Sequence, residues 1–135
     1  MYCMVLYIFC NFAAMENYIA NVEAQMRKGI LELCILNIIA SEVEIYPSEI
    51  IARLKESKLI VVEGTLYPLL TRLKNQGLLS YQWVESPSGP PRKYYSLTEA
   101  GRACLDELNK TWNELIFAVK QTIKKSKRNE ENSNS

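Results

Sequence analysis

The sequence predicts a mainly α-helical fold of the α+β class, with a small two-stranded ribbon and one long helix after it. Three observations support this prediction. Leucines at helical spacing mark residues 63–76, strand-like alternation flanks the turn at 86–91, and apolar residues at alternating intervals of three and four mark residues 99–125. A short helix followed by a ribbon with a basic tip is the layout of a winged helix-turn-helix domain.

We expect four regions along the 135 residues. Residues 1–14 form an apolar extension, and residues 15–97 form the winged helix-turn-helix domain. Residues 98–125 form a dimerisation helix, and residues 126–135 form a polar tail that is disordered because its composition offers no apolar face to bury.

The first region, MYCMVLYIFCNFAA, carries no charged side chain. Three interpretations stay open: a dispensable extension produced by a start codon assigned too early, a helix packed on a dimer, or a membrane anchor. The segment is shorter than the roughly 20 apolar residues that a spanning helix needs, and it lacks the basic start of a signal peptide. We therefore expect a cytoplasmic protein with no stable membrane association.

Two helices should precede the leucine-rich one. Residues 21–41 repeat apolar side chains on two faces, so this helix should be buried on most sides and should touch both its own domain and a partner. Pro47 suits the first turn of the next helix, residues 47–57, where a missing N–H costs little. The linker 58–62 is unusually apolar, and we expect it to bury Ile60 or Val62 under the ribbon.

The third helix, residues 63–76, should present one apolar stripe and one polar face. Leu66, Leu69, Leu70 and Leu73 are spaced i, i+3, i+4 and i+7, which places them together. Gly77 follows as the natural stop. The strands of the ribbon are predicted at residues 78–85 and 92–97, and Thr98 is a plausible N-cap for the last helix.

Charge and residue types narrow the function. The net charge is only +1, but residues 47–97 hold seven basic and four acidic side chains, which gives this unit a charge of +3. The chain has no histidine, and its four cysteines form no CxxC pair, so we expect no metal site and no cofactor. Carboxylates and cysteines lie at no recognisable catalytic spacing, so we expect no enzyme activity and no catalytic residue.

Two motifs carry a family resemblance. GTLYPLL followed by RL and GLL, and then GPPRKYYSLTEAG, resemble the PadR family of bacterial transcriptional regulators over roughly residues 26–125. The resemblance implies that the third helix enters the DNA major groove and that the tyrosine of its LYP segment contacts the backbone. Tyr67 and Pro68 stand at those positions. Residues 1–14 have no counterpart in a typical family member.

Polar side chains opposite the leucine stripe can meet base edges and phosphates. The candidate DNA-binding residues on the helix are Thr65, Tyr67, Pro68, Thr71, Arg72 and Asn75. Arg92 and Lys93 follow two prolines at the ribbon tip, and we expect them to bind phosphate or the minor groove. The competing interpretations are a solvated helix face and a hairpin tip that is basic by chance.

The last helix should form the dimer. Its seam consists of Leu105, Leu108, Trp112, Leu115 and Val119, which alternate spacings of three and four. The resemblance implies packing against the first helix of the other subunit, and in some short members a slot for flat aromatic molecules. Trp112 is either part of such a slot, for a small aromatic or hydrophobic effector, or simply an interface anchor.

The sequence therefore predicts a homodimeric regulator, a repressor by expectation, that binds double-stranded DNA at an inverted repeat. The alternative is a protein-interaction or ligand-sensing module on the same fold without direct DNA binding, because winged helices also serve as docking units. The weak net charge favours this alternative.

Overall fold

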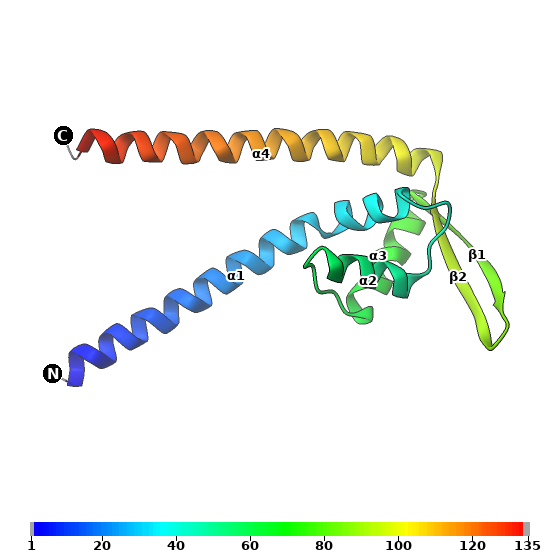
Figure 1. The fold of residues 1–135 in the computed structure, drawn as a ribbon, viewed down its shortest axis with the longest axis horizontal. Coiled ribbons are helices and arrows are strands. Elements are labelled where there is room, and N and C mark those ends of the chain that lie inside the picture. The colour runs from blue at the N-terminus through cyan, green and yellow to red at the C-terminus, as the bar shows by residue number, and fades with distance from the viewer. Residues whose placement is uncertain (1, 134–135) are drawn as a thin grey trace.

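A computed structural model describes residues 2–133 and confirms the predicted fold class. The chain runs through α1 (Tyr2–Ala40), α2 (Pro47–Glu56), α3 (Glu63–Asn75), β1 (Leu79–Ser86), β2 (Gly89–Leu97) and α4 (Glu99–Ser133). In Figure 1 the inner end of α1, with α2 and α3, forms a compact head beside the ribbon. The outer parts of α1 and α4 leave this head as two arms that diverge.

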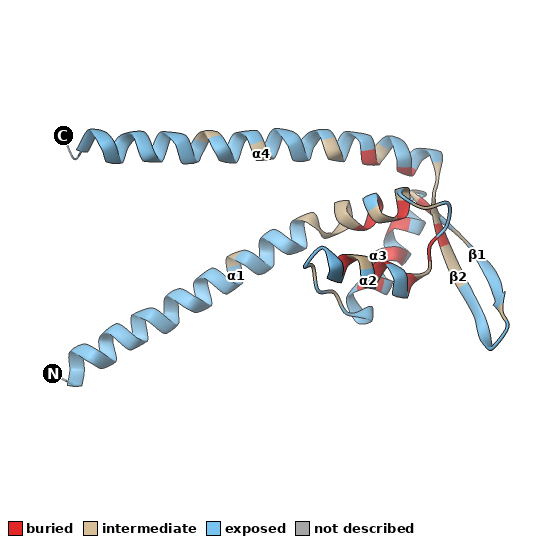
Figure 2. Ribbon diagram, viewed as in Figure 1, coloured by how far each residue is buried: buried red, intermediate tan, exposed pale blue. Residues whose placement is uncertain are grey.

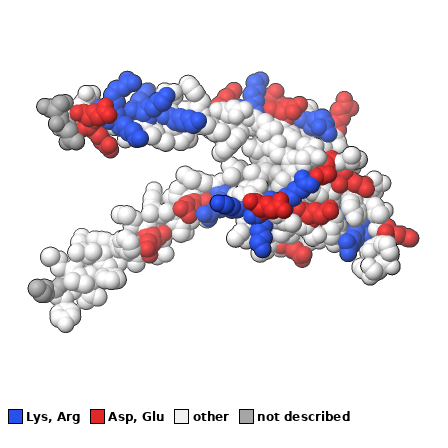
Figure 3. Space-filling model, viewed as in Figure 1, with Lys and Arg blue, Asp and Glu red and all other residues white. Residues whose placement is uncertain are grey.

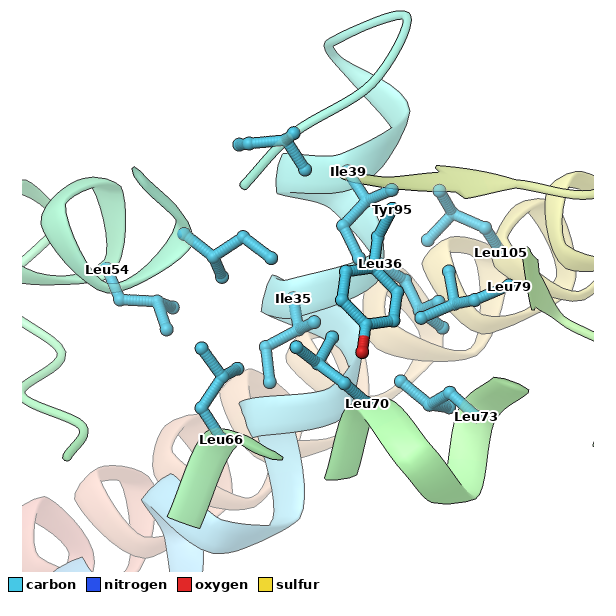
Figure 4. Close-up of a cluster of buried hydrophobic side chains, with 12 residues drawn as sticks. Ile35, Leu36, Ile39, Leu54, Leu66, Leu70, Leu73, Leu79, Tyr95 and Leu105 are labelled. Carbon is cyan, nitrogen blue, oxygen red and sulfur yellow. The ribbon is translucent and has the colours of Figure 1, made fainter. Parts of the chain in front are cut away.

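The core lies where the head, the ribbon base and the start of α4 meet. Its members are buried apolar side chains from every element, and Figure 4 shows most of them converging: Ile35, Leu36, Ile39, Ile45, Ile50, Leu54, Leu66, Leu70, Leu73, Leu79, Tyr95 and Leu105. The predicted stripe of α3 supplies three of them, with Leu69 half-buried beside it. Full burial of each leucine contributes about 1.5–3 kcal/mol, which fixes α3 to the head by one side only.

Backbone hydrogen bonds set the angle between α3 and the ribbon. Gly77 has φ 78° and ends α3, while the N–H of Leu78 donates to Leu73 O at 3.0 Å and that of Gly77 to Lys74 O at 2.9 Å. These two bonds satisfy carbonyls at the helix end, and the left-handed conformation suits glycine. The Thr98 hydroxyl donates to Gly77 O at 2.6 Å and accepts the Gly101 N–H at 3.0 Å. Thr98 therefore caps α4, as predicted, and also ties it to the end of α3.

The ribbon is an antiparallel pair whose register places Tyr81 opposite Tyr95 and Trp83 opposite Lys93. A single bridge adds the segment between α1 and α2 to it: the Ile45 N–H donates to Tyr95 O at 2.9 Å and the Tyr95 N–H to Ile45 O at 2.8 Å. This bridge holds the ribbon base against the head and brings the following residue, Tyr46, beside β2.

The first helix is longer than predicted. Instead of starting at Asn21, α1 runs without a break from Tyr2, so residues 2–14 are its outer turns and are all exposed (Figure 2). The segment contains neither glycine nor proline, so no residue in it interrupts a helix. Extending an existing helix also avoids the unfavourable nucleation step, because each added residue forms one more backbone hydrogen bond. By length and composition alone this helix could cross a membrane, a criterion that signal sequences and core helices also meet.

Two further predictions are corrected. The last helix does not end at Lys125 but continues to Ser133, so residues 126–133 are helical rather than disordered; residues 134–135 lie outside the described part. The charged residues after Lys125 pack on no core. They extend a helix that already exists, so no new nucleation step is needed. In the linker, Ile60 and Val62 are 83% and 65% exposed, whereas Leu59 and Val61 pack against the core. Helix α2 ends where predicted to within one residue.

Candidate nucleic-acid interface

The exposed side of α3 brings most of the predicted DNA-binding residues together. A shallow hollow of about 620 Å³ is lined by Tyr67, Pro68, Thr71, Arg72 and Asn75, with Gln76 at its end. Pro68 sits within the second turn, and with Gly64 it keeps this side of the helix low in bulk. Hydroxyl, amide and guanidinium groups line this hollow, and the buried leucines hold the opposite side of α3 in the core. Such polar groups are suited to hydrogen bonds with the edges of base pairs.

Thr65 does not join this group. It lines a different groove, between α3, the linker before it and the α1 residues Arg27, Lys28 and Leu31. Seven residues make about two helical turns, so Thr65 stands on the same side of α3 as Arg72, at the edge of the polar face. Thr65 thus lies outside the hollow, and its assignment to the DNA-binding group stays a prediction.

Arg72 is held by a carboxylate from another helix. Its guanidinium forms an ion pair with Glu32 of α1, and both side chains are partly exposed. Such an exposed pair contributes about 0–1 kcal/mol, so a stronger anion can displace the carboxylate. The structure thus places Arg72 at the border between the α3 hollow and α1.

A second cleft lies between α3 and the ribbon and has a volume of about 410 Å³. Tyr67 and Thr71 line it from α3, and Arg92 and Lys93 line it from β2. The remaining lining residues are Tyr46, Pro47, Trp83, Pro90, Pro91 and Tyr95. The two predicted groups, helix and ribbon tip, therefore share one cleft.

Aromatic rings, rather than carboxylates, hold the cations around this cleft. The Arg92 guanidinium lies 4.8 Å from the centroid of the Tyr46 ring. The Lys93 ammonium lies 4.4 Å from the Tyr81 ring centroid and 5.1 Å from that of Trp83. From α3, the Lys74 ammonium lies 5.6 Å from the same Tyr81 ring. A ring face attracts a cation without neutralising it.

None of these three side chains forms an ion pair within the described residues. The ion pairs among residues 2–133 involve Arg27, Arg53, Arg72 and Lys110, and none of them includes Lys74, Arg92 or Lys93. Aromatic contacts restrict the side chains, which reduces the entropy lost when they bind a ligand. A restrained group of unpaired cations beside a helix face of hydrogen-bonding groups is suited to a polyanion.

The Tyr67 hydroxyl stays protonated over the whole physiological range. Burial raises the pKa of Tyr67 above its ordinary value, with further contributions from the negative charge of Glu63 and from Tyr46. Since the ring is still 43% exposed, the hydroxyl can donate a hydrogen bond to an acceptor that enters the cleft.

The predicted dimer seam lies on α4, away from these two clefts. Leu105 is buried in the core of its own domain, so the prediction that it lies in the seam is corrected; the first turn of α4 packs on the ribbon base. Leu108, Trp112, Leu115 and Val119 are exposed along the helix.

A groove of about 280 Å³ separates part of this seam from α1. Leu108, Thr111, Trp112 and Leu115 line one side, and the other side consists of Gly29, Ile30 and Leu33. The two arms are joined nearby by Asn37 and Asn109, whose side-chain amides donate to one another's oxygens at 3.0 and 3.1 Å. Trp112 therefore faces an apolar groove beside the point where the arms meet.

The cysteines are free thiols in the structure. Cys3 and Cys10 are exposed on α1, whereas burial raises the pKa of the Cys34 thiol and makes it a poorer nucleophile at neutral pH. Within residues 2–133 the structure has no group of three or more His, Cys, Asp or Glu side chains placed to hold a metal ion.

Sequence reasoning missed Tyr46 and Trp83, which line the cleft, and the stacked pair Lys74 and Tyr81 on α3 and the ribbon. Side chains alternate along a strand, so the sequence does place Tyr81 and Trp83 on one face of β1. Only the pairing of Trp83 with Lys93 in the ribbon shows that this face binds a cation. Tyr46 enters through the bridge at Ile45, a feature of one residue pair that leaves no periodic signal in the sequence.

Comparison with known proteins identifies relatives of this chain. The family model described as the transcriptional regulator PadR-like family matches residues 35–107. An uncharacterized protein of Lysinibacillus sphaericus is 32% identical over 97 residues, covering 70% of this chain and 88% of that protein.

Solved structures of PadR-like regulators also resemble this chain. A PadR-like transcription factor from Bacteroides fragilis is 60% identical with a TM-score of 0.64, over 75% of this chain and 97% of that one. A PadR family regulator from Eggerthella lenta is 29% identical with a TM-score of 0.75, over 82% and 96%. Bacillus subtilis PadR, solved with operator DNA, is 22% identical with a TM-score of 0.54, over 58% and 45%, and shares the fold.

Proposed function

Because this chain belongs to the PadR-like family of transcriptional regulators, we propose that it is a dimeric repressor that binds an inverted-repeat operator in double-stranded DNA. In each subunit α3 lies in the major groove, where Thr71 and Asn75 reach base edges. The ribbon grips the adjoining backbone through Arg92 and Lys93. Two such units related by a two-fold axis read half-sites whose centres lie about one helical turn apart.

The observation that carries this proposal is the cleft between α3 and the ribbon. Arg92 and Lys93 line it and Lys74 stacks on Tyr81 of the same ribbon; each of the three lies over an aromatic ring, and none is paired with a carboxylate among the described residues. Protein surfaces normally mix charges, so three unpaired and restrained cations beside a polar helix face favour a strand of phosphates as the ligand. The operator in the Bacillus subtilis PadR structure supports the same partner.

Mobility shift and fluorescence anisotropy test this function. The duplex is the region upstream of the chain's own transcription unit, with a random duplex of equal length as the control. Binding at low ionic strength that prefers the upstream region, and weakens linearly with the logarithm of salt concentration, is expected. Absence of binding to every duplex at low salt contradicts the proposal.

The apolar groove between α1 and α4 supports a small aromatic or hydrophobic effector. Trp112 lines it, and a planar molecule of modest size fits about 280 Å³. An effector that binds the DNA-free form better lowers operator affinity by linkage. Titration of a flat aromatic dye into the Trp83→Phe variant, in which Trp112 is the remaining tryptophan, measures this: quenching is expected, and unchanged emission contradicts the effector site.

The alternative function is a protein-interaction or ligand-sensing module without DNA binding. The exposed apolar side chains of both arms favour it, because such surfaces attract partners. The mobility shift above separates the two functions.

We expect a cytoplasmic protein, because Asn11, Glu16 and Asn17 interrupt the apolar outer part of α1. Figure 3 shows few charged side chains on this outer part. Fractionation therefore has to decide whether the chain associates with membranes. The full chain and a chain starting at Met15 should both stay in the soluble fraction; recovery of the full chain alone with membranes contradicts this expectation.

A further inference from the structure

Trp83 occupies an unusual place for a large apolar side chain. It is 61% exposed on β1, so it adds little to the core, yet it lines the cleft between α3 and the ribbon. On the same face Tyr81 meets it edge to face, with ring centroids 6.3 Å apart and an interplanar angle of 88°. The neighbouring ring thus fixes the orientation of an indole that remains open to solvent.

The partner of Trp83 across the ribbon is Lys93. The Lys93 ammonium lies between the Tyr81 and Trp83 rings, 4.4 Å and 5.1 Å from their centroids. A phosphate oxygen bound by an ammonium group lies about 2.7–2.9 Å from it. A phosphate on Lys93 therefore comes into reach of the indole, and so does the sugar next to it.

We propose that Trp83 contacts the DNA backbone directly: its indole packs on the deoxyribose adjoining the phosphate that Lys93 binds. This inference rests on the proposed DNA-binding function. The ring N–H of Trp83 is a donor that suits a phosphate oxygen. Trp83 lies four residues before the turn at residues 87–88 and lines the cleft together with α3 residues, so it borders the DNA backbone inside the cleft instead of entering the base stack as a wedge at the tip.

This role has a distinct energetic signature. Loss of the indole removes apolar contact but no charge, so Trp83→Ala should weaken binding about tenfold without changing the salt dependence. Lys93→Ala should instead reduce the salt slope by about one counterion per subunit. Trp83→Phe keeps a ring and should retain most of the affinity. Because a sugar carries no base identity, Trp83→Ala should weaken operator and random duplex by the same factor.

Fluorescence reports the contact in the folded protein without relying on a loss of affinity. In the Trp112→Phe variant, Trp83 is the remaining tryptophan. Addition of operator duplex should change its emission and protect it from acrylamide quenching. The matched Trp83→Phe variant, which reports from Trp112 on α4, should show little protection by DNA.

The outcomes separate this inference from the proposed function. If the wild-type protein binds the operator but Trp83 emission and acrylamide access stay unchanged, Trp83 does not contact DNA and the inference is overturned. A loss of affinity by Trp83→Ala on the operator alone also overturns it, because that result means base reading. If the wild-type protein binds no duplex, the proposed function itself fails.

Discussion

Glu32 on α1 and Arg72 on α3 form an ion pair that joins an arm of the molecule to the helix proposed to read DNA. Arg72 also lines the hollow on the exposed side of α3, so the carboxylate and a DNA phosphate would compete for one guanidinium. Glu32 stands one residue before Leu33, which lines the groove between α1 and α4. The pair therefore connects the exposed side of α3 to the helix that lines the groove.

The first prediction concerns this competition. Glu32→Gln should release Arg72 and strengthen operator binding about two- to fivefold, because an exposed pair contributes at most about 1 kcal/mol. The salt slope should steepen by up to about one counterion per subunit. In the Arg72→Ala background, Glu32→Gln should have no effect on anisotropy titrations; an equal gain there would show that Glu32 acts by general charge and not through Arg72.

The second prediction concerns the ribbon. Arg92→Ala combined with Lys93→Ala should weaken binding to all duplexes and flatten the salt dependence by up to about two counterions per subunit, since both cations lack carboxylate partners among the described residues. Anisotropy at several salt concentrations measures the slope. Lys110→Ala, on α4, is the control and should leave it unaltered. An unchanged slope in the double variant removes the ribbon from the interface.

The third prediction concerns sequence reading. Thr71→Ala or Asn75→Ala should reduce the preference for operator over random duplex, with a cost on the operator of about 1–3 kcal/mol for a good base contact. Both side chains line the exposed hollow of α3, so the fold should not suffer. Competition titrations give the preference. Equal losses on both duplexes would mean that these residues position the backbone only.

The fourth prediction concerns the dimer. Leu108→Asp should dissociate it, because the exposed seam of α4 would bury an unpaired carboxylate on association. Sedimentation analysis measures the mass, and Asp106→Asn, two residues earlier and therefore on the opposite side of α4, is the control that should stay dimeric. A stable dimer of Leu108→Asp would show that the subunits associate elsewhere.

The fifth prediction concerns the joint between the head and α4. A Cβ at Gly101 would overlap the carbonyl oxygen of Leu78 and lie 2.8 Å from Leu97 Cδ2. Gly101→Ala should therefore destabilise the protein by about 1–3 kcal/mol or more, because backbone atoms cannot yield like a flexible side chain. Gly29→Ala, with open space around the new atom, should stabilise it by about 0.5–1 kcal/mol. Thermal unfolding of the two variants compares them; equal behaviour contradicts the clash.

Local rules determined much of this protein from its sequence. The leucine spacing of α3, the stop at Gly77 and the cap at Thr98 each follow from interactions within a few residues, and the structure confirms all three. Such features need no knowledge of distant segments, since helix periodicity and backbone hydrogen bonds are short-range. The structure places Tyr67, Thr71, Arg92 and Lys93 around one cleft, because helix and ribbon are consecutive; their role in DNA binding stays a prediction.

Only the tertiary structure decided which cations pair with a carboxylate and which stack on an aromatic ring. Arg72 looks equivalent to Lys74 along the sequence, yet Glu32 pairs with the former while Tyr81 stacks with the latter. Partners 40 residues apart along the chain, as Glu32 and Arg72 are, meet through packing of α1 on the head, and no local pattern specifies that contact. Leu105 likewise fits a seam by spacing but lies in the core, because burial depends on what the fold places opposite each side chain.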